Sequence, residues 1–127
     1  MKYLVTYADT DAGGVLHHAK YLELAESGRH WWLKERNLSF VKVNAQYNCS
    51  LVVSRVKAHY KHAIYLEDMI DIKTTLTSFE RNRMQWDTHI FKEDLLVCKI
   101  SASIVCVDSQ KRTVRTFPEH LMSSLKV

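Results

Sequence analysis

Proline and glycine are scarce in this chain. Its 127 residues contain one proline and three glycines, and no stretch rich in serine or glycine interrupts them. Linkers between domains are commonly built from such residues, because they keep a chain extended or flexible. A chain of this length also suits one domain, which buries roughly two thirds of its unfolded surface. We therefore expect a single domain over residues 1–127.

The sequence also lacks a long uncharged apolar run. No segment approaches the ~20 residues that a membrane-spanning helix needs. Near the N-terminus, Asp9 interrupts the chain before an apolar core of signal-peptide length develops. These absences predict a cytoplasmic protein that does not insert into a membrane.

Several site signatures are missing as well. Cys49, Cys98 and Cys106 are odd in number and have no C-x-x-C spacing, which argues against a disulfide framework or a zinc knuckle and predicts buried, reduced thiols. Gly13 and Gly14 fit neither the G-x-G-x-x-G fingerprint nor a Walker loop, and no G-x-S-x-G elbow is present. A serine hydrolase is therefore not expected.

Charge of one sign is not gathered in one place. The formal net charge of +4 and the pI near 9.0 favour anionic partners. The basic residues are scattered along the chain, however, and no nucleic-acid-binding signature accompanies them. We therefore predict no nucleic-acid partner.

The hydrophobic residues that the chain does have recur with two spacings, one typical of a helix and one typical of strands. From about Ala19 to Glu35 they recur three and four apart, which predicts a helix with one apolar stripe. Residues 2–8 predict a strand that ends at Asp9, and a short helical turn is expected near residues 40–44. Beyond residue 50 the period is two, and the strands are expected within 50–60, 70–76, 84–90 and 96–106. A long helix followed by an antiparallel meander is an α+β pattern.

Two of these elements predict which residues face the core. The helix stripe comprises Tyr21, Leu24, Ala25, Gly28, Trp31 and Trp32. The inward face of the last strand comprises Leu96, Cys98, Ile100, Ala102, Ile104 and Cys106. Gly28 lowers helix propensity by roughly 1 kcal/mol relative to alanine. Its presence indicates that another element, most simply a sheet, packs closely against the helix there.

Two carboxylates, Asp9 and Asp11, separate the first strand from the helix. The glycine pair after them can adopt positive φ and fold the loop back until a carboxylate faces the helix start near His18. The first N–H groups of a helix lack partners and carry the positive end of its macrodipole. A carboxylate beside such donors suits hydrolysis, as a nucleophile or base next to an oxyanion pocket. Taken alone, an Asp before a helix is more commonly a cap or turn former.

The same stretch resembles a known motif. Its residues are Tyr7, Asp9-Thr10-Asp11-Ala12-Gly13-Gly14-Val15, His18-Ala19, Tyr21, Glu26 and Arg29. They are similar to the motif of the hot-dog-fold acyl-CoA thioesterases, especially the Tol-Pal-associated (YbgC-type) branch of the 4-hydroxybenzoyl-CoA thioesterase family. Matches at Tyr60, Ala63, Asp68 and 105–108 extend the likeness over nearly the whole chain. The family usually has Tyr, Asn, Glu and Pro in place of His17, Lys20, Ala8 and His62, which bears on substrate choice more than on reaction type.

The resemblance implies a hot-dog fold, in which a curved antiparallel sheet wraps one long central helix. It implies hydrolysis of an acyl-CoA to the free acid and CoA, with Asp11 as nucleophile or general base and the backbone N–H at His18 polarising the carbonyl. No metal and no cofactor are expected, since coenzyme A is part of the substrate. Further substrate contacts are expected at Gly14, Val15, His17, Tyr21 and Tyr60. Candidates for the CoA phosphates are Lys57, Lys61, Arg83, Lys111 and Arg112.

The resemblance also bears on partners. Family members usually form homodimers through the sheet, and often homotetramers. An acyl carrier protein is a further candidate partner. The alternative function is a non-catalytic protein of the same fold that binds an acyl-CoA or acyl carrier protein as a scaffold. A hydratase or dehydratase of the same fold is a third possibility.

Several side-chain roles stay open from sequence. The His18 imidazole can orient Asp11 or water, close the first helical turn, or bind a metal with His17, although adjacent histidines do not face each other on a helix. Asp9 can order the loop by accepting N–H bonds, which we favour, or share a proton with Asp11. Glu26 and Arg29 can form a surface ion pair or support the site. Tyr60, His62 and Asp68 can come from the neighbouring subunit and line the acyl or pantetheine channel, or serve strand packing and a turn.

Overall fold

The computed structural model describes residues 1–125. In chain order its elements are β1 (Lys2–Leu4), the 3₁₀ turn η1 (Tyr7–Asp9), α1 (His18–Lys34), α2 (Phe40–Tyr47), β2 (Ser50–Tyr60), β3 (Met69–Phe79), β4 (Met84–Lys92), β5 (Leu95–Val107), β6 (Val114–Arg115) and α3 (Glu119–Leu125). The long helix and the four long strands lie where the two periods predict them. Within residues 1–125, no helix combines the length and the hydrophobicity that crossing a membrane requires.

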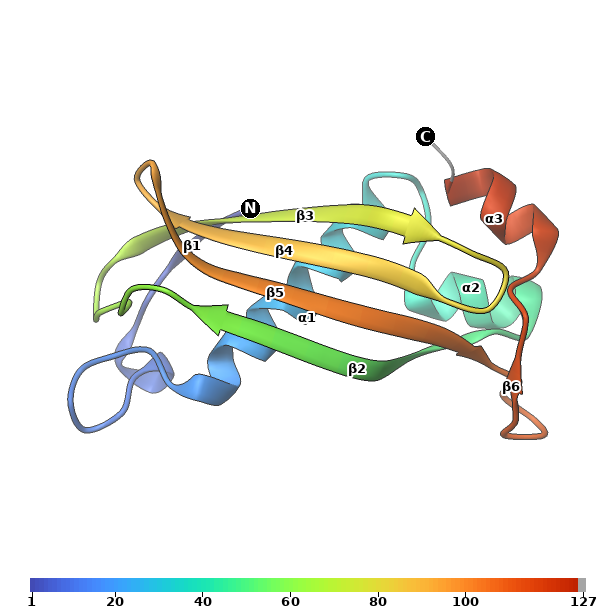
Figure 1. The fold of residues 1–127 in the computed structure, drawn as a ribbon, viewed down its shortest axis with the longest axis horizontal. Coiled ribbons are helices and arrows are strands. Elements are labelled where there is room, and N and C mark those ends of the chain that lie inside the picture. The colour runs from blue at the N-terminus through green and yellow to red at the C-terminus, as the bar shows by residue number, and fades with distance from the viewer. Residues whose placement is uncertain (126–127) are drawn as a thin grey trace.

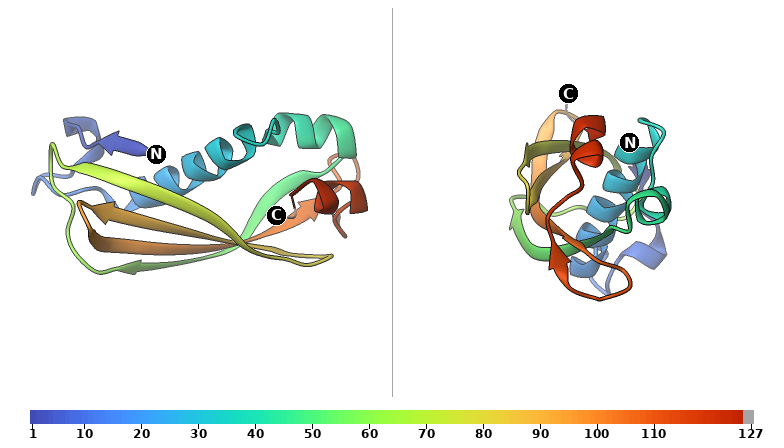
Figure 2. Two further views of the ribbon diagram at one scale, coloured as in Figure 1. Left: turned by 90° about the horizontal axis from the view of Figure 1, so that it is seen from above. Right: turned by 90° about the vertical axis from the view of Figure 1, so that its right-hand side faces the viewer.

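The strands form one antiparallel sheet. Its order is β1-β3-β4-β5-β2, and the short β6 pairs with the end of β5. Helix α1 runs behind this sheet in Figure 1, and the end-on view in Figure 2 shows the strands curving around it. The prediction of a curved antiparallel sheet wrapped around one long helix is confirmed.

Helix α1 packs directly against the sheet at its glycine. A methyl group at Gly28 would collide with Oγ1 of Thr74 and lie 3.4 Å from Cγ2 of Ile72, both on β3. Only a residue without a side chain allows this approach. The sequence-based explanation of Gly28, close packing by a sheet, is confirmed.

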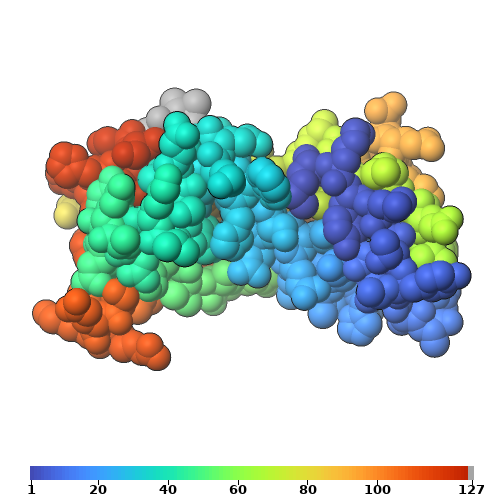
Figure 3. All heavy atoms as spheres, turned by 180° about the vertical axis from the view of Figure 1, so that it is seen from behind, coloured from blue at the N-terminus to red at the C-terminus, as the bar shows by residue number. Residues whose placement is uncertain are grey.

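The interior divides into two apolar clusters along α1. The first surrounds the start of the helix and contains Val5, Leu16, Tyr21, Leu24, Ala25, Ile64, Ile70, Ile72, Ile90, Val97, Cys98 and Ile100. The second surrounds its end and contains Trp32, Leu33, Val43, Cys49, Met84, Trp86, Ile104, Cys106, Phe117, Leu121 and Leu125. Seen from the helix side in Figure 3, the N-terminal segment covers one end of the molecule, and α2 and α3 cover the other. The three cysteines are buried and free, as predicted.

Two predictions about facing residues are corrected. Trp31 is 52% exposed, while Arg29 and Leu33 are buried, so the buried stripe of α1 is rotated away from Trp31. On β5, a bulge opposite Ile90 and Phe91 turns the buried position from Leu96 to Val97, which is 1% exposed. Because the side-chain period of a strand is two, one extra residue reverses the faces beyond it.

The chain segments at the two ends of the fold also differ from prediction. The first strand ends at Leu4 instead of Asp9, because the chain turns into η1 with the Asp9 carboxylate accepting the Thr6 N–H at 2.9 Å. Helix α2 continues to Tyr47, beyond the turn expected at residues 40–44. Ser39 caps its start, and Asn48 ends it in the left-handed conformation with φ of 50°. The elements β6 and α3 were not predicted.

Candidate active site

The loop between η1 and α1 closes on itself like a small hairpin. The His17 N–H donates to the Asp9 carbonyl at 2.8 Å, and the Asp11 N–H donates to the Val15 carbonyl at 3.0 Å. At the tip, the Gly14 N–H donates to the Asp11 carbonyl, and Gly14 has a φ of 76°, a conformation that favours glycine. The loop therefore brings Asp11 back beside the start of α1, as its glycines predict.

A second segment holds this loop in place. The Leu16 N–H donates to the Ile64 carbonyl at 2.8 Å, and the Leu66 N–H donates to the Gly14 carbonyl at 3.0 Å. An isolated bridge also joins Val15 to Tyr65. The backbone of the loop is thus tied to the segment that joins β2 to β3.

Asp11 keeps most of its carboxylate available. Its Oδ1 accepts the Gly13 N–H at 2.8 Å, and Oδ2 accepts no hydrogen bond from the described residues. The residue is exposed, and its side chain lines a cavity of about 250 Å³. A carboxylate in this state can accept a proton from water or attack an electrophile.

The start of α1 has a backbone donor that is free among the described residues, at a residue that also lines this cavity. His17 is the N-cap, with φ of −65° and ψ of 140°, and its Nδ1 accepts the Ala19 N–H at 3.3 Å. His18 is the first helical residue, and its N–H donates to no acceptor within residues 1–125. The first turn contains no acidic residue that would offset the positive end of the macrodipole.

The cavity joins polar groups to an aromatic wall. Its lining comprises Asp11, Val15, Leu16, His18, Tyr21, Tyr60, Lys61, His62 and Ala63. The Tyr60 ring meets the Tyr21 ring edge-on, with centroids 4.8 Å apart, and the His18 ring at 5.4 Å. Burial, with smaller contributions from Cys98 and Tyr60, raises the pKa of Tyr21 to about 12. The Tyr21 hydroxyl therefore stays neutral at physiological pH.

The structure brings together five of the seven residues predicted for the site. They are Asp11, Val15, His18, Tyr21 and Tyr60. Gly14 and His17 do not line the cavity: Gly14 forms the loop tip, and His17 caps the helix. Their substrate contacts stay predictions.

Two lining residues, Leu16 and Ala63, were missed as site residues. They reach the cavity through the pairing of the loop with the 64–66 segment, which no local pattern announces. Lys61 and His62 were raised as a phosphate contact and a channel residue, and both line the cavity. The other basic candidates, Lys57, Arg83, Lys111 and Arg112, are not part of its lining.

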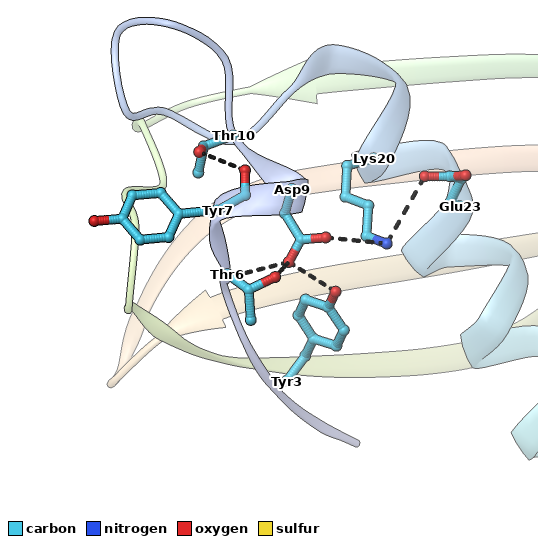
Figure 4. Close-up of polar contacts among 7 residues, drawn as sticks. All are labelled: Tyr3, Thr6, Tyr7, Asp9, Thr10, Lys20 and Glu23. Carbon is cyan, nitrogen blue, oxygen red and sulfur yellow. Dashed lines mark hydrogen bonds and ion pairs between the residues drawn. The ribbon is translucent and has the colours of Figure 1, made fainter.

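On the opposite side of the loop, Asp9 is buried among partners (Figure 4). It is 4% exposed, and its Oδ2 accepts from the Tyr3 hydroxyl at 2.8 Å and from the Thr6 N–H at 2.9 Å. Its Oδ1 lies 3.2 Å from Nζ of Lys20. Burial alone would raise the pKa of Asp9, but the hydrogen bonds from Thr6, Tyr3 and Lys20 outweigh it and lower the pKa below its usual value. Asp9 orders the loop, as favoured from sequence.

The structure also bears on the roles considered for Glu26 and Arg29. The surface ion pair of Glu26 with Arg29 is wrong: Arg29 is 5% exposed, and Glu26 lies 3.7 Å from His30. Burial lowers the pKa of Arg29, although Glu26 opposes the shift.

Asp68 forms a turn, since its Oδ2 accepts the Tyr65 N–H at 2.8 Å and its Oδ1 lies 3.0 Å from Nζ of Lys92. Over residues 1–125, no three His, Cys, Asp or Glu side chains are grouped as a metal site.

The chain is similar to thioesterases over nearly its whole length. The model of the thioesterase-like superfamily matches residues 5–125. The acyl-CoA thioester hydrolase YbgC of Escherichia coli O6:H1 is 31% identical over 123 residues, which cover 96% of this chain and 91% of that protein. The predicted resemblance to the YbgC-type thioesterases is thereby confirmed.

Solved structures agree on the fold. The DHNA-CoA thioesterase of Staphylococcus aureus superposes with a TM-score of 0.88 at 20% identity, over 98% of this chain and 85% of that one. A second Staphylococcus aureus protein, solved in complex with CoA, superposes with a TM-score of 0.87 at 17% identity, over 98% and 79% of the two chains. At these identities the likeness extends to the architecture alone, which is the one expected from sequence.

Proposed function

Because the chain belongs to the thioesterase-like superfamily, we propose that it hydrolyses the thioester of an acyl-CoA, with Asp11 as the catalytic carboxylate. The observation that carries this proposal is one cavity lined by both Asp11 and the first residue of α1, His18. A thioester placed there meets an oxygen nucleophile or base and a backbone donor at once.

The reaction then needs two contributions from the chain. Asp11 either attacks the thioester carbonyl carbon to form an anhydride, which water then hydrolyses, or takes a proton from a water molecule that attacks this carbon. In both routes the C–S bond breaks, the acyl group ends as the free acid, and the CoA thiolate leaves and takes up a proton from water. A positioned general base contributes roughly 10²- to 10⁴-fold to the rate. The oxyanion receives a hydrogen bond from the His18 N–H, a type of donor worth about 10²- to 10³-fold.

The cavity lining supports a division between the two ends of the substrate. Tyr21 and Tyr60 form an apolar wall suited to the acyl group or the pantetheine arm. Among the five basic residues considered for the CoA phosphates, Lys61 has the best support, because it alone lines the cavity that Asp11 lines. We place the anionic end of the substrate toward Lys61.

We also propose that two chains pair through β2. This eleven-residue strand lies at the edge of the sheet, and its pairing partner within the chain is β5. Val52, Val53 and Val56 are each 41 or 42% exposed along it, and such an edge favours pairing with another strand. A sedimentation measurement tests this proposal, since Val56→Asp should give monomers while the wild type gives dimers or tetramers.

A panel of acyl-CoAs tests the proposed reaction. Purified protein is given short, aromatic and long acyl-CoAs, and the release of free thiol is followed with a thiol reagent. Hydrolysis of at least one class at a rate proportional to protein concentration supports the proposal. Saturable binding of acyl-CoA without thiol release would instead identify a non-catalytic scaffold. Acyl carrier protein loaded with the same acyl group extends the panel to a protein-borne thioester.

Oxygen-18 tracing addresses the route that Asp11 takes. A single turnover is run in labelled water, and both the acid product and the peptide that contains Asp11 are analysed by mass. Label in the Asp11 side chain requires direct attack and an anhydride that water opens at Asp11. Label in the acid alone favours a water molecule activated by Asp11.

A further inference from the structure

The loop that carries Asp11 has a fixed base beside α1. The base is the hydrogen bond from the His17 N–H to the Asp9 carbonyl, at 2.8 Å. Asp11 lies two residues beyond Asp9 on one arm of the loop, and His18 directly follows the other arm. The distance between the Asp11 carboxylate and the helix start therefore depends on how this base is held.

One side chain of the helix contacts the base of the loop. Tyr3 and Thr6, which donate to Asp9, precede it by six and three residues and belong to the same N-terminal stretch. Lys20 comes from the first turn of α1 instead, and its Nζ lies 3.2 Å from Oδ1 of Asp9 (Figure 4). The Lys20 side chain is 26% exposed and runs over the Tyr3 ring, with Nζ 5.4 Å from the ring centroid.

We infer that Lys20 is a positioning residue, whose ion pair with Asp9 sets how the Asp11 loop meets the start of α1. The inference rests on the proposed function of Asp11. Lys20 lies outside the cavity lining and acts on the reaction only through Asp9 and the loop.

The charges around Asp9 show why the lysine matters. The titratable groups that face its carboxylate are the Tyr3 hydroxyl and the Lys20 ammonium, and the exposed Glu23 lies 3.9 Å from that ammonium. A buried carboxylate that loses its cation either takes up a proton or moves toward water. Either change loosens the loop base, and a misplacement of ~1 Å can reduce a rate by about 10²-fold.

Kinetics of three variants test the inference. Lys20→Met should lower kcat about tenfold while KM stays within about twofold, because the change misaligns reacting groups more than it weakens binding. Lys20→Arg keeps the cation and should restore most of kcat. Lys34→Met, in the exposed last turn of the same helix, is the matched control and should behave as the wild type.

The pH profile separates this role from general support of the fold. In Lys20→Met the pKa of Asp9 loses a contribution that lowers it, so Asp9 takes up a proton at a higher pH than in the wild type. The acid limb of kcat should therefore move to higher pH in Lys20→Met and return in Lys20→Arg. An unchanged acid limb together with wild-type kcat in Lys20→Met overturns the inference.

Amide hydrogen exchange gives a readout that needs no activity. The His17 and Asp11 amides, which bond to the Asp9 and Val15 carbonyls, should exchange about tenfold faster in Lys20→Met and at the wild-type rate in Lys34→Met. If Lys20→Met fails to fold, Lys20→Gln removes the charge but keeps a polar group beside Asp9, and it should accelerate the same amides. A wild type without thioesterase activity refutes the proposed function, whereas unchanged exchange refutes the role of Lys20.

Discussion

Asp9 and Asp11 are the same residue type, two positions apart, in opposite environments. Asp9 is buried and accepts three hydrogen bonds besides its ion pair with Lys20. Asp11 is exposed, and among the described residues only Gly13 donates to its side chain. One carboxylate is occupied in holding the fold together, and the other is left free for a substrate.

The comparison shows how a short loop can separate stability from chemistry. A buried carboxylate needs several donors to offset its desolvation, and those donors fix its position. A carboxylate that is to react has to stay free of such donors. The two arms of the loop satisfy both demands, because Asp9 forms its base and Asp11 points to the cavity.

The sharpest test of this separation is Asp11→Asn. We expect kcat to fall by about 10²- to 10⁴-fold, because the amide can neither attack nor serve as a base. The free energy of unfolding should change by less than about 0.5 kcal/mol, since the site is exposed. Thiol release and urea denaturation measure the two quantities. A variant that hydrolyses as fast as the wild type would show that Asp11 is not the catalytic carboxylate.

Asp9→Asn should reduce the stability of the protein more than Asp11→Asn does, and reduce kcat less. The amide keeps the shape but loses the charge that Lys20, Tyr3 and Thr6 complement, so we expect unfolding to become easier by about 2 kcal/mol. Any loss of kcat should be smaller than in Asp11→Asn, because the reacting groups are still present. Equal stabilities of the two variants in urea would contradict the assignment of Asp9 to the fold.

Acid titration refines the same contrast. The lowered pKa of Asp9 means that its stabilising contribution is complete above the unfolded-state value of about 4 and is lost as the pH falls through the lower, folded-state value. The stability difference between wild type and Asp9→Asn should be constant from about pH 5 to 7 and shrink in stronger acid. Urea denaturation at several pH values measures this difference. A gap that persists unchanged well below pH 3 would exclude the charged form of Asp9 as its source.

Local patterns in the sequence predicted the positions of the long helix and of the four long strands. The hydrophobic period of α1 and the alternation of the last strand depend on residues close together in the chain, and Gly28 correctly predicted a close contact with the sheet. Errors arose where a distant contact decided the outcome. The extra residue on β5 lies where the register of its pairing with β4 shifts, and Arg29, expected in a surface ion pair, is buried on α1.

In the candidate site, too, the contacts between residues close in the chain were predicted and those between distant segments were not. Asp11, Gly14 and the helix start follow one another in the chain, so their meeting could be anticipated. The position of Lys20 opposite Asp9 depends on the angle between η1 and α1, and the lining by Leu16 and Ala63 depends on pairing with the 64–66 segment. No periodicity encodes either contact.

The smallest expected effect concerns the glycine pair that separates the two arms of the loop. Gly14 has a φ of 76°, whereas Gly13 does not have a positive φ and a methyl group there would lie 3.4 Å from Oδ1 of Asp11, an ordinary contact. Alanine at position 14 should therefore destabilise the protein by about 1 kcal/mol, because the left-handed conformation is strained for any residue with a Cβ. Gly13→Ala should cost less in urea denaturation, and it should leave kcat closer to the wild type. If the two alanine variants prove equivalent in both measurements, the turn at Gly14 does not set the position of Asp11. The hydrogen bonds at the base of the loop then position Asp11 without it.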